Sequence, residues 1–270
     1  MNRMPTLRRL GTATGLGVLA ASAALIVASP LRAAPPAAPG TGTIKGRLIY
    51  TAGPAPAAKV VVAKGDPKVK DDVCKKADLF DKAFVVDPAS KGVGNAFAYL
   101  VKPSGDYKAA EEALLAQKPE VVIDQIDCEF IPYAAVVHKD QKLTFKSSDP
   151  VGHNVHFNAF ANTPMNQMLP PNGKMAYAIK KSERRPTELV CDIHPWMKSY
   201  FFVVDTPFAT VTNPDGSFEI TGVPAGDQQL VVWQSKTGYV NEGGNKGMKV
   251  TVKADGVTDV GEVKITKEPK

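Results

Sequence analysis

The sequence is poor in cysteine, in aromatic residues and in charge of one sign. Its 270 residues include only three Cys, too few for a disulfide scaffold and without the paired spacing of a zinc finger. Aromatic residues make up 7%, and the 22 Gly and 22 Pro favour strands and turns over a helical bundle. With 44% hydrophobic residues, the chain can still bury one large or two ordinary cores.

The positive charge is concentrated at the start of the chain. The formal net charge is +6, and residues 1–33 contain four Arg and no acidic residue. The remainder therefore has 29 basic and 27 acidic residues, a net charge of +2. A body so close to neutral gives no electrostatic reason to expect a nucleic-acid partner.

The first 33 residues have the layout of a secretory signal peptide. A basic start that includes Arg8 and Arg9 precedes an apolar run over residues 11–28, and a Leu-Arg-Ala site follows. The alternative is an uncleaved membrane anchor, because the run is near the lower length limit of a span. The layout predicts export to the periplasm or beyond in a bacterium, no membrane span after cleavage, and a compartment that permits disulfides.

The remaining sequence has the pattern of short strands separated by turns. Residues 34–42 form an Ala/Pro linker, and residues 43–265 contain recurring short runs of alternating or β-branched residues. Residues 107–117 alone have clear helical spacing, and residues 162–172 are expected to be a proline-broken loop. The pattern predicts an all-β fold made of β-sandwiches.

One stretch carries most of the chemical information. Cys191-Asp-Ile-His194-Pro-Trp-Met197 offers a thiolate, an imidazole and a thioether at two-residue gaps after a predicted strand. Soft thiolate and thioether donors favour copper, and one Cys with two His and a weak axial Met defines a blue-copper site. His153 and His156 are candidates for the second imidazole. They are an odd number of residues apart on one strand, so only one should face the metal.

These residues resemble the blue-copper cupredoxins, the family of plastocyanin and amicyanin. The Cys-x-x-His-Pro-aromatic-Met loop is similar to the ligand loop of that family, and His-Asn-Val at 153–155 is similar to the strand that carries its first copper ligand. The resemblance implies a Greek-key cupredoxin sandwich over residues 65–205 that binds one type-1 copper. The ligands that it implies are His153, Cys191, His194 and Met197.

The resemblance also assigns roles to residues around these ligands. Asn154 is expected to tie the two ligand segments together and to hydrogen-bond near the thiolate, and Pro195 to support the loop from beside the ligands. In cupredoxins the His of the ligand loop lies nearest to the surface. His194 and Trp196 are therefore the expected electron exit.

The residues taken singly have other interpretations. Cys191 could be an ordinary buried thiol, Met197 a core residue and His194 a surface residue. Zinc held by Cys191, His194 and His153 is also chemically acceptable, because zinc binds sulfur and nitrogen donors tetrahedrally. A zinc site would leave Met197 without a purpose.

The two other cysteines are expected to pair. If Cys191 binds metal, Cys74 and Cys128 remain, and two thiols left over in an exported protein favour a disulfide. The alternative is a pair of free buried thiols.

The two ends of the chain resemble a second family, the carboxypeptidase regulatory-like (transthyretin-like) β-sandwiches. Residues 42–50 are similar to the opening strand of that family, and residues 208–233 to later strands around an Asn-Pro-Asp-Gly hairpin turn. The resemblance implies a smaller sandwich built from residues 43–64 and 206–268 and interrupted by the copper domain. The combination is similar to uncharacterised exported bacterial proteins.

The leading functional hypothesis is a periplasmic or secreted carrier of single electrons with one copper and an unidentified redox protein partner. An enzyme is not expected, because Val190 and Asp192 flank Cys191 where multicopper oxidases place His, and no catalytic constellation stands out. The competing hypothesis is an exported cell-surface or cell-wall binding module whose copper, or zinc, is structural or stored.

Overall fold

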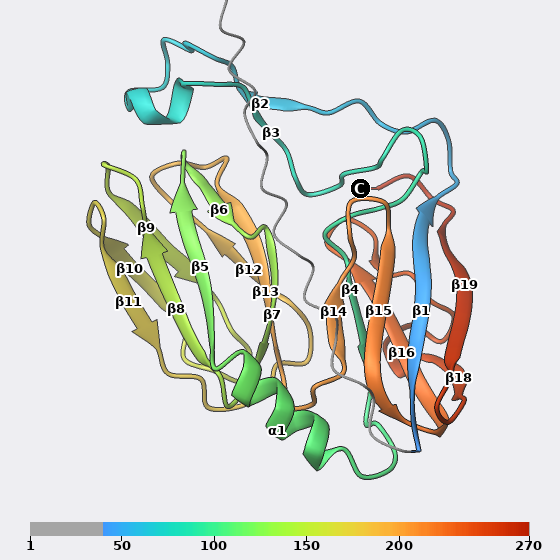
Figure 1. Ribbon diagram of the computed structural model, residues 1–270. Coiled ribbons are helices and arrows are strands. Elements are labelled where there is room, and N and C mark those ends of the chain that lie inside the picture. Colours follow the sequence, from blue (N-terminus) through green and yellow to red (C-terminus); the bar gives the residue numbers. More distant parts are fainter. Residues whose placement is uncertain (1–39, 270) are drawn as a thin grey trace, which may run out of the picture. The chain divides into compact units, whose positions relative to one another are not determined.

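The computed structural model describes residues 40–269, whose regular secondary structure is almost entirely β-strand (Figure 1). The strands form two β-sandwiches, so the expectation of an all-β fold is confirmed. The signal peptide expected over residues 1–33 lies outside the described residues, as does most of the linker over residues 34–42. Within the described part of the chain, no helix has the length and apolar character needed to cross a membrane.

The first sandwich contains nine strands from the middle of the chain. They are β5 (Glu120–Ile126), β6 (Glu129–Ile131), β7 (Ala134–His138), β8 (Lys142–Ser147), β9 (His153–Phe157), β10 (Met165–Leu169), β11 (Lys174–Tyr177), β12 (Thr187–Val190) and β13 (Lys198–Val204). One sheet has the order β10-β9-β12-β13-β7 and the other the order β11-β8-β5-β6. Between them, Phe201 packs edge-on against Phe145 and Phe157.

Strand β10 occupies the region that was expected to be a proline-broken loop. It pairs antiparallel with β9, from Met165 opposite Phe157 to Leu169 opposite His153. Leu169 alone of its five side chains is buried, so the strand lacks the alternation that identifies a half-buried strand in a sequence. It forms one edge of its sheet, where pairing on a single side is sufficient.

The second sandwich joins the two ends of the described chain. Its strands are β1 (Thr41–Tyr50), β4 (Phe97–Leu100), β14 (Ala209–Val211), β15 (Ser217–Pro224), β16 (Gly226–Gln234), β17 (Gly238–Tyr239), β18 (Met248–Val252) and β19 (Val257–Ile265). One sheet has the order β15-β1-β19, and the other has the order β14-β4-β16-β17 with β18 also paired to β16. Alternation along β1 buries Ile44 and Leu48 completely. Gly46 lies between them, where a Cβ atom would come within 2.6 Å of the Phe218 ring.

Two elements lie outside the segments expected for their sandwich. Strand β4 is within residues 65–205, yet it pairs with β14 and β16 of the second sandwich. Conversely, β2 (Val60–Val62), within residues 43–64, pairs with β3 (Leu79–Phe80) and contributes Val62 to the core of the first sandwich. Both runs are short and apolar, and their partners are decided by distant segments rather than by local pattern.

The Asn213–Gly216 turn forms, but it does not join a hairpin. Asn213 N–H donates to Ser217 O at 2.9 Å, and Gly216 adopts a φ of +80°. The strands on either side belong to opposite sheets, because β14 pairs with β4 and β15 pairs with β1. The turn therefore connects the two layers of the second sandwich.

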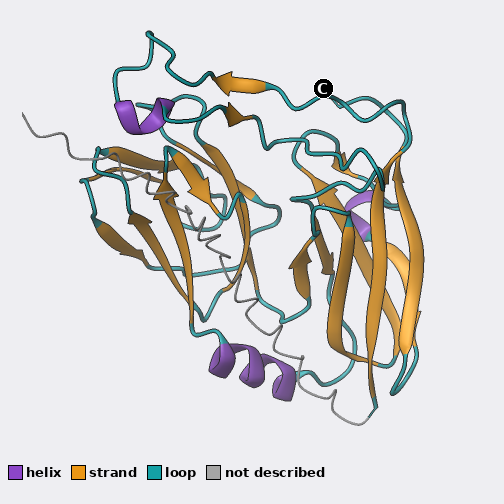
Figure 2. Ribbon diagram, turned by 45° about the horizontal axis from the view of Figure 1, so that its top comes forward, coloured by secondary structure: helices purple, strands orange, loops and turns teal. Residues whose placement is uncertain are grey.

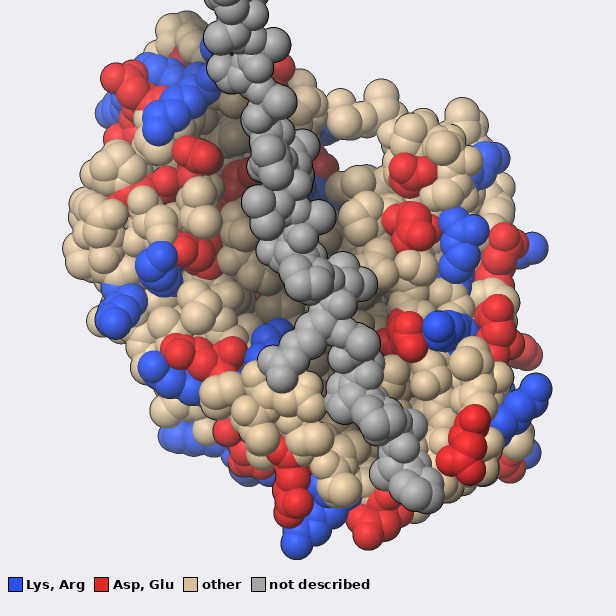
Figure 3. Space-filling model, in the orientation of Figure 1, with Lys and Arg blue, Asp and Glu red and all other residues tan. Residues whose placement is uncertain are grey.

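Among the described residues the one α-helix, α1 (Lys108–Gln117), has the position that its spacing predicts (Figure 2). It buries no residue, and Glu111 Oε1 lies 3.0 Å from Nε2 of the buried His138. Two short 3₁₀ helices complete the described elements, η1 (Asp72–Lys75) and η2 (Gly244–Lys246). On the face seen in Figure 3, acidic and basic side chains are interspersed, in keeping with the near-neutral net charge of the body.

Candidate metal centre

The ligand loop, residues 191–197, is a tight connection between β12 and β13. Its ends are joined by a hydrogen bond from Cys191 N–H to Met197 O at 3.2 Å, and Met197 N–H donates to His194 O at 2.8 Å. Cys191 and Met197 are each 1% exposed and belong to the core of the first sandwich. The loop thereby holds the thiol, the thioether and the imidazole of His194 on the inner side of the chain.

His153, the first residue of β9, completes a cluster of three donors. Its Nδ1 lies 2.9 Å from Nδ1 of His194, and the sulfur of Cys191 lies 3.8 Å from the same His194 atom. One donor atom from each of the three residues lies within 4.8 Å of the other two. The three residues are 0–3% exposed, so the cluster is closed to solvent.

The outer nitrogen of each imidazole faces a carboxylate. Nε2 of His153 lies 2.8 Å from Asp149 Oδ2, and Nε2 of His194 lies 2.9 Å from Asp71 Oδ2. The neutral tautomer that donates from Nε2 leaves the Nδ1 lone pair directed at the cluster. Carboxylate–imidazole pairs of this kind fix the orientation and increase the basicity of histidines that bind metals.

The cluster strongly favours a charged thiolate–imidazolium pair. Burial alone would raise the pKa of Cys191, but hydrogen bonds from His153, His194 and the backbone of Asn154 outweigh it and lower that pKa to about 6. Burial alone would lower the pKa of His153, but Asp149 and Cys191 outweigh it and raise that pKa to about 9. The pKa of His194 is also raised, because its contacts with Cys191 and Asp71 outweigh burial.

Asn154 ties β9 to the ligand loop through Asp192. Its Oδ1 accepts the backbone N–H of Asp192 at 2.6 Å, and its Nδ2 donates to Asp192 Oδ2 at 2.9 Å. These contacts match the role expected for Asn154, and its backbone also hydrogen-bonds to the sulfur of Cys191.

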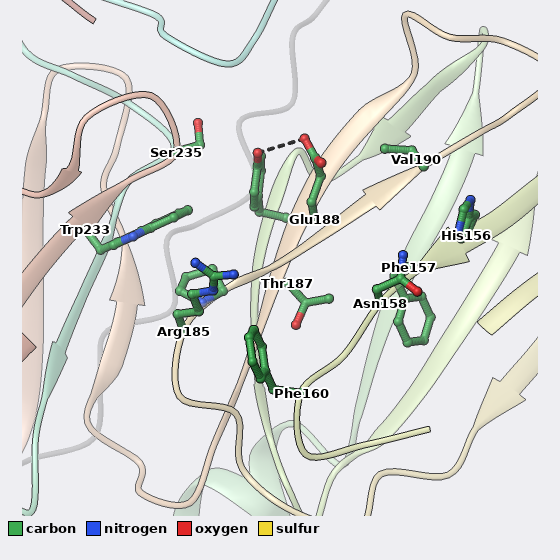
Figure 4. Close-up of a pocket in the computed structure, with 12 residues that line it drawn as sticks. His156, Phe157, Asn158, Phe160, Arg185, Thr187, Glu188, Val190, Trp233 and Ser235 are labelled. Atoms are coloured by element: carbon green, nitrogen blue, oxygen red, sulfur yellow. Dashed lines mark hydrogen bonds between the residues drawn. The ribbon is translucent and has the colours of Figure 1, made fainter. Parts of the chain in front are cut away.

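His156 lies on the opposite face of β9 from His153. Its Nδ1 is 2.8 Å from Asp192 Oδ1, and 29% of its side chain is exposed. Together with Val190 it lines a pocket of about 370 Å³ to which none of the three convergent donors contributes (Figure 4). Strand alternation thus separates the two histidines, with His153 alone in the cluster.

The expected exposure of His194 is not found. The imidazole is buried, and its Nε2 faces the carboxylate of Asp71 instead of solvent. Exposed residues of the loop include Pro195 and Ile193, the latter 47% exposed. Trp196 is half-buried, and its ring centroid is 5.1 Å from that of His194. The role of His194 as the surface residue of an electron exit therefore has to be revised, because a distant segment covers it.

Cys74 and Cys128 form the expected disulfide, which closes a separation of 54 residues. Cys191 remains free and buried. The sulfur atoms of the bridge are also within 4.8 Å of a ring nitrogen of His194. The bridge is thus part of the wall of the donor cluster as well as a connection between distant segments.

Two residues of the site, Asp149 and Asp71, were not among those expected from the sequence. Asp149 precedes His153 by four residues, a proximity that could have marked it, and it also accepts the backbone N–H groups of Asp127 and Cys128 at 2.7 and 2.8 Å. Asp71 lies 123 residues from His194 in the chain, so no local signal could have identified it.

The donor set fits a copper ion better than a hard cation. Two imidazole nitrogens and a thiolate of low pKa converge, with a buried thioether in the same loop, and this combination is soft. The outer nitrogens of both histidines already have acceptors, as metal-binding histidines require. His153, Cys191 and His194 are the residues that would hold the ion.

No protein-family model and no curated protein matches this chain. Among solved structures, a Cu-containing nitrite reductase from Thermus scotoductus SA-01 is 17% identical, with a TM-score of 0.29, over 32% of this chain and 22% of its own. A reduced Cu(I) form of an amicyanin mutant is 19% identical, with a TM-score of 0.28, over 32% of this chain and 82% of its own. The match therefore spans less than a quarter of the reductase. Similarities this weak carry no functional argument, which has to come from the site itself.

Proposed function

We propose that this protein is an exported cupredoxin with one type-1 copper and that it carries single electrons. The observation that supports the proposal is the convergence of Cys191 Sγ with the Nδ1 atoms of His153 and His194 in a closed core. One thiolate and two imidazoles are the equatorial donors of blue-copper sites, and Met197 offers the weak axial thioether. When bound, copper supplies a one-electron couple between Cu(I) and Cu(II).

The chain's own contribution is to hold the donors in one geometry. The backbone hydrogen bonds of the ligand loop, the Asn154–Asp192 contacts and the two carboxylate–imidazole pairs restrain the donors from different sides. A rigid donor set undergoes little rearrangement between oxidation states, which favours rapid electron transfer. The same burial keeps water away from the sulfur.

For the electron exit we propose Trp196 rather than the edge of His194. The indole is in contact with the His194 ring and is only half-buried. It lines a pocket of about 150 Å³ together with Pro195 and Met197. A redox protein that docks there would exchange electrons with the metal centre through the indole. We propose no catalytic role for the site.

The alternative is an exported binding module with a structural or stored metal, either copper or zinc. The observation that favours it is the complete closure of the donor cluster, since a stored or structural ion needs no route to the surface. Zinc would use the same thiolate and imidazoles.

Copper loading tests the proposal directly. Titration of the metal-free protein with Cu(II) should give one equivalent bound, an intense thiolate charge-transfer colour and preference over zinc, and redox titration should be reversible. The Cys191→Ser variant should remain colourless, because Cys74 and Cys128 are held in the disulfide. A colourless wild-type complex, equal preference for zinc, or a metal that does not cycle would favour the binding module.

A further inference from the structure

Residues 64–78, here called the cap segment, form a compact loop between β2 and β3 (cyan in Figure 1). Its ends are joined by a hydrogen bond from Lys64 N–H to Asp78 Oδ1 at 2.7 Å. Val69 and Val73 are 8% and 6% exposed and pack into the core of the first sandwich. The cap segment is therefore fixed to the sandwich that carries the donor cluster.

The cap segment hydrogen-bonds to the donor cluster through the carboxylate of Asp71. Asp71 Oδ2 lies 2.9 Å from Nε2 of His194, and the His194 side chain is only 4% exposed, whereas that of Asp71 is 39% exposed. Asp71, which is the more exposed of the two, thus covers the Nε2 edge of the imidazole.

The disulfide anchors that carboxylate. Cys74 follows Asp71 by three residues, and its N–H donates to Asp71 O at 3.0 Å. Its partner, Cys128, accepts a hydrogen bond from Trp196 Nε1 at 3.2 Å through its backbone oxygen. The bridge therefore connects the cap segment to the turn that contacts the ligand loop.

We propose that the cap segment closes the outer edge of the metal centre and that Asp71 is the positioning residue that holds the His194 imidazole with Nδ1 toward the donors. The role of Asp71 in positioning a copper ligand rests on the proposed function. The covering of His194 by the cap segment does not, because it is present in the metal-free protein. The disulfide keeps the cap segment in place, and its two cysteines are fully buried. Access to His194 requires the cap segment to move.

Asp71 acts on the imidazole by fixing its orientation. A carboxylate on Nε2 selects the tautomer with a free Nδ1 lone pair and prevents the ring from turning toward solvent. Loss of such outer partners typically costs about 10–100-fold in metal affinity. Asp72 offers a matched control, because it carries the same charge one residue later, with a side chain that is 93% exposed and paired to Lys75.

The first arm of the test compares Asp71→Ala, Asp71→Asn and Asp72→Ala. In metal-free protein, acylation of His194 by diethylpyrocarbonate, followed by peptide mass spectrometry, should be several-fold faster in Asp71→Ala than in wild type. His156 serves as an internal reference and should react at an unchanged rate. In copper-loaded protein, Asp71→Ala should lose about 10–100-fold in affinity. Asp71→Asn should recover most of this loss through its amide oxygen, and Asp72→Ala should match wild type.

The second arm opens the anchor with Cys74→Ser/Cys128→Ser. His194 should become reactive and amide hydrogen exchange in the cap segment should accelerate, although Asp71 is retained. If the double variant does not fold, Asp71→Ala alone decides the question. Wild-type reactivity of His194 in Asp71→Ala would overturn the inference, as would an equal effect of Asp72→Ala. Absence of a copper colour in wild type would instead overturn the proposed function, while the acylation result would still decide whether the cap segment closes the site.

Discussion

The Nδ1 atoms of His153 and His194 lie 2.9 Å apart, although 41 residues separate them in the chain. Two imidazole nitrogens approach this closely when one of them carries a proton and the other accepts it. The outer nitrogens are already directed at Asp149 and Asp71. A metal ion at the cluster therefore has to replace the proton between the rings, and we expect metal affinity to fall as pH falls.

His153→Ala and His156→Ala should have opposite consequences. His153→Ala removes one of the three convergent donors, so metal affinity and the charge-transfer colour should both be lost. His156→Ala should leave the colour nearly intact, because this side chain contacts Asp192 on the other face of β9. Visible spectra of the two copper-loaded variants make the comparison. Loss of colour in His156→Ala but not in His153→Ala would contradict the finding that His153 is the residue of β9 that faces the donor cluster.

Met197→Leu should preserve the colour and raise the reduction potential. Leucine has a similar volume and suits the buried position, so the loop should keep its fold. An axial thioether bond is long and weak, and its loss removes electron donation to Cu(II) without removing the equatorial donors. Voltammetry of wild type and variant measures the shift. An unchanged or lowered potential would mean that the thioether does not act on the metal.

Cys191 should titrate with a midpoint near pH 6 in the metal-free protein, instead of near its ordinary value of 9.0. Because the pKa is lowered on folding, the thiolate contributes stability in full above about pH 9 and loses it as pH falls through about 6. The pKa of His153 is raised from 6.5 to about 9, so its protonated form stabilises the fold in full below about pH 6.5. That stabilisation is lost as pH rises through about 9. The ultraviolet absorbance of the thiolate follows the first titration, and Cys191→Ser should abolish the signal. A Cys191 midpoint between pH 8 and 9 would contradict the pairing of its thiolate with the two imidazoles.

Thiol counting on unfolded, metal-free protein should find one free thiol, that of Cys191. The Cys74–Cys128 bridge spans 54 residues, and chain entropy alone predicts a stabilisation of about 4 kcal/mol from such a closure. Cys74→Ser/Cys128→Ser should lower the free energy of unfolding by that order, as measured by urea denaturation. Three free thiols in the wild type would show that the bridge does not form.

Much of the candidate site could be predicted from the sequence, because its donors lie in short segments. The spacing of Cys191, His194 and Met197 places all three on one tight loop. Strand alternation allows only one of His153 and His156 to face the donors, and the resemblance of His-Asn-Val at 153–155 to the cupredoxin ligand strand favoured His153. The leftover cysteines also pair as expected. These inferences depend on geometry within a few residues, on counting cysteines, or on the resemblance of a short motif, and none of them requires knowledge of the tertiary contacts.

Tertiary structure alone decided what surrounds those donors. Asp71 and His194 are 123 residues apart in the chain, and they meet only because the cap segment packs against the first sandwich. The disulfide joins the cap segment to that sandwich. Likewise, β4 joins the second sandwich through strands more than 100 residues away, and the turn at residues 213–216 connects two layers instead of forming a hairpin. The local sequence determined turns, alternation and donor spacing. Sheet partners and the closure of the metal centre depend on long-range packing, which no local pattern encodes.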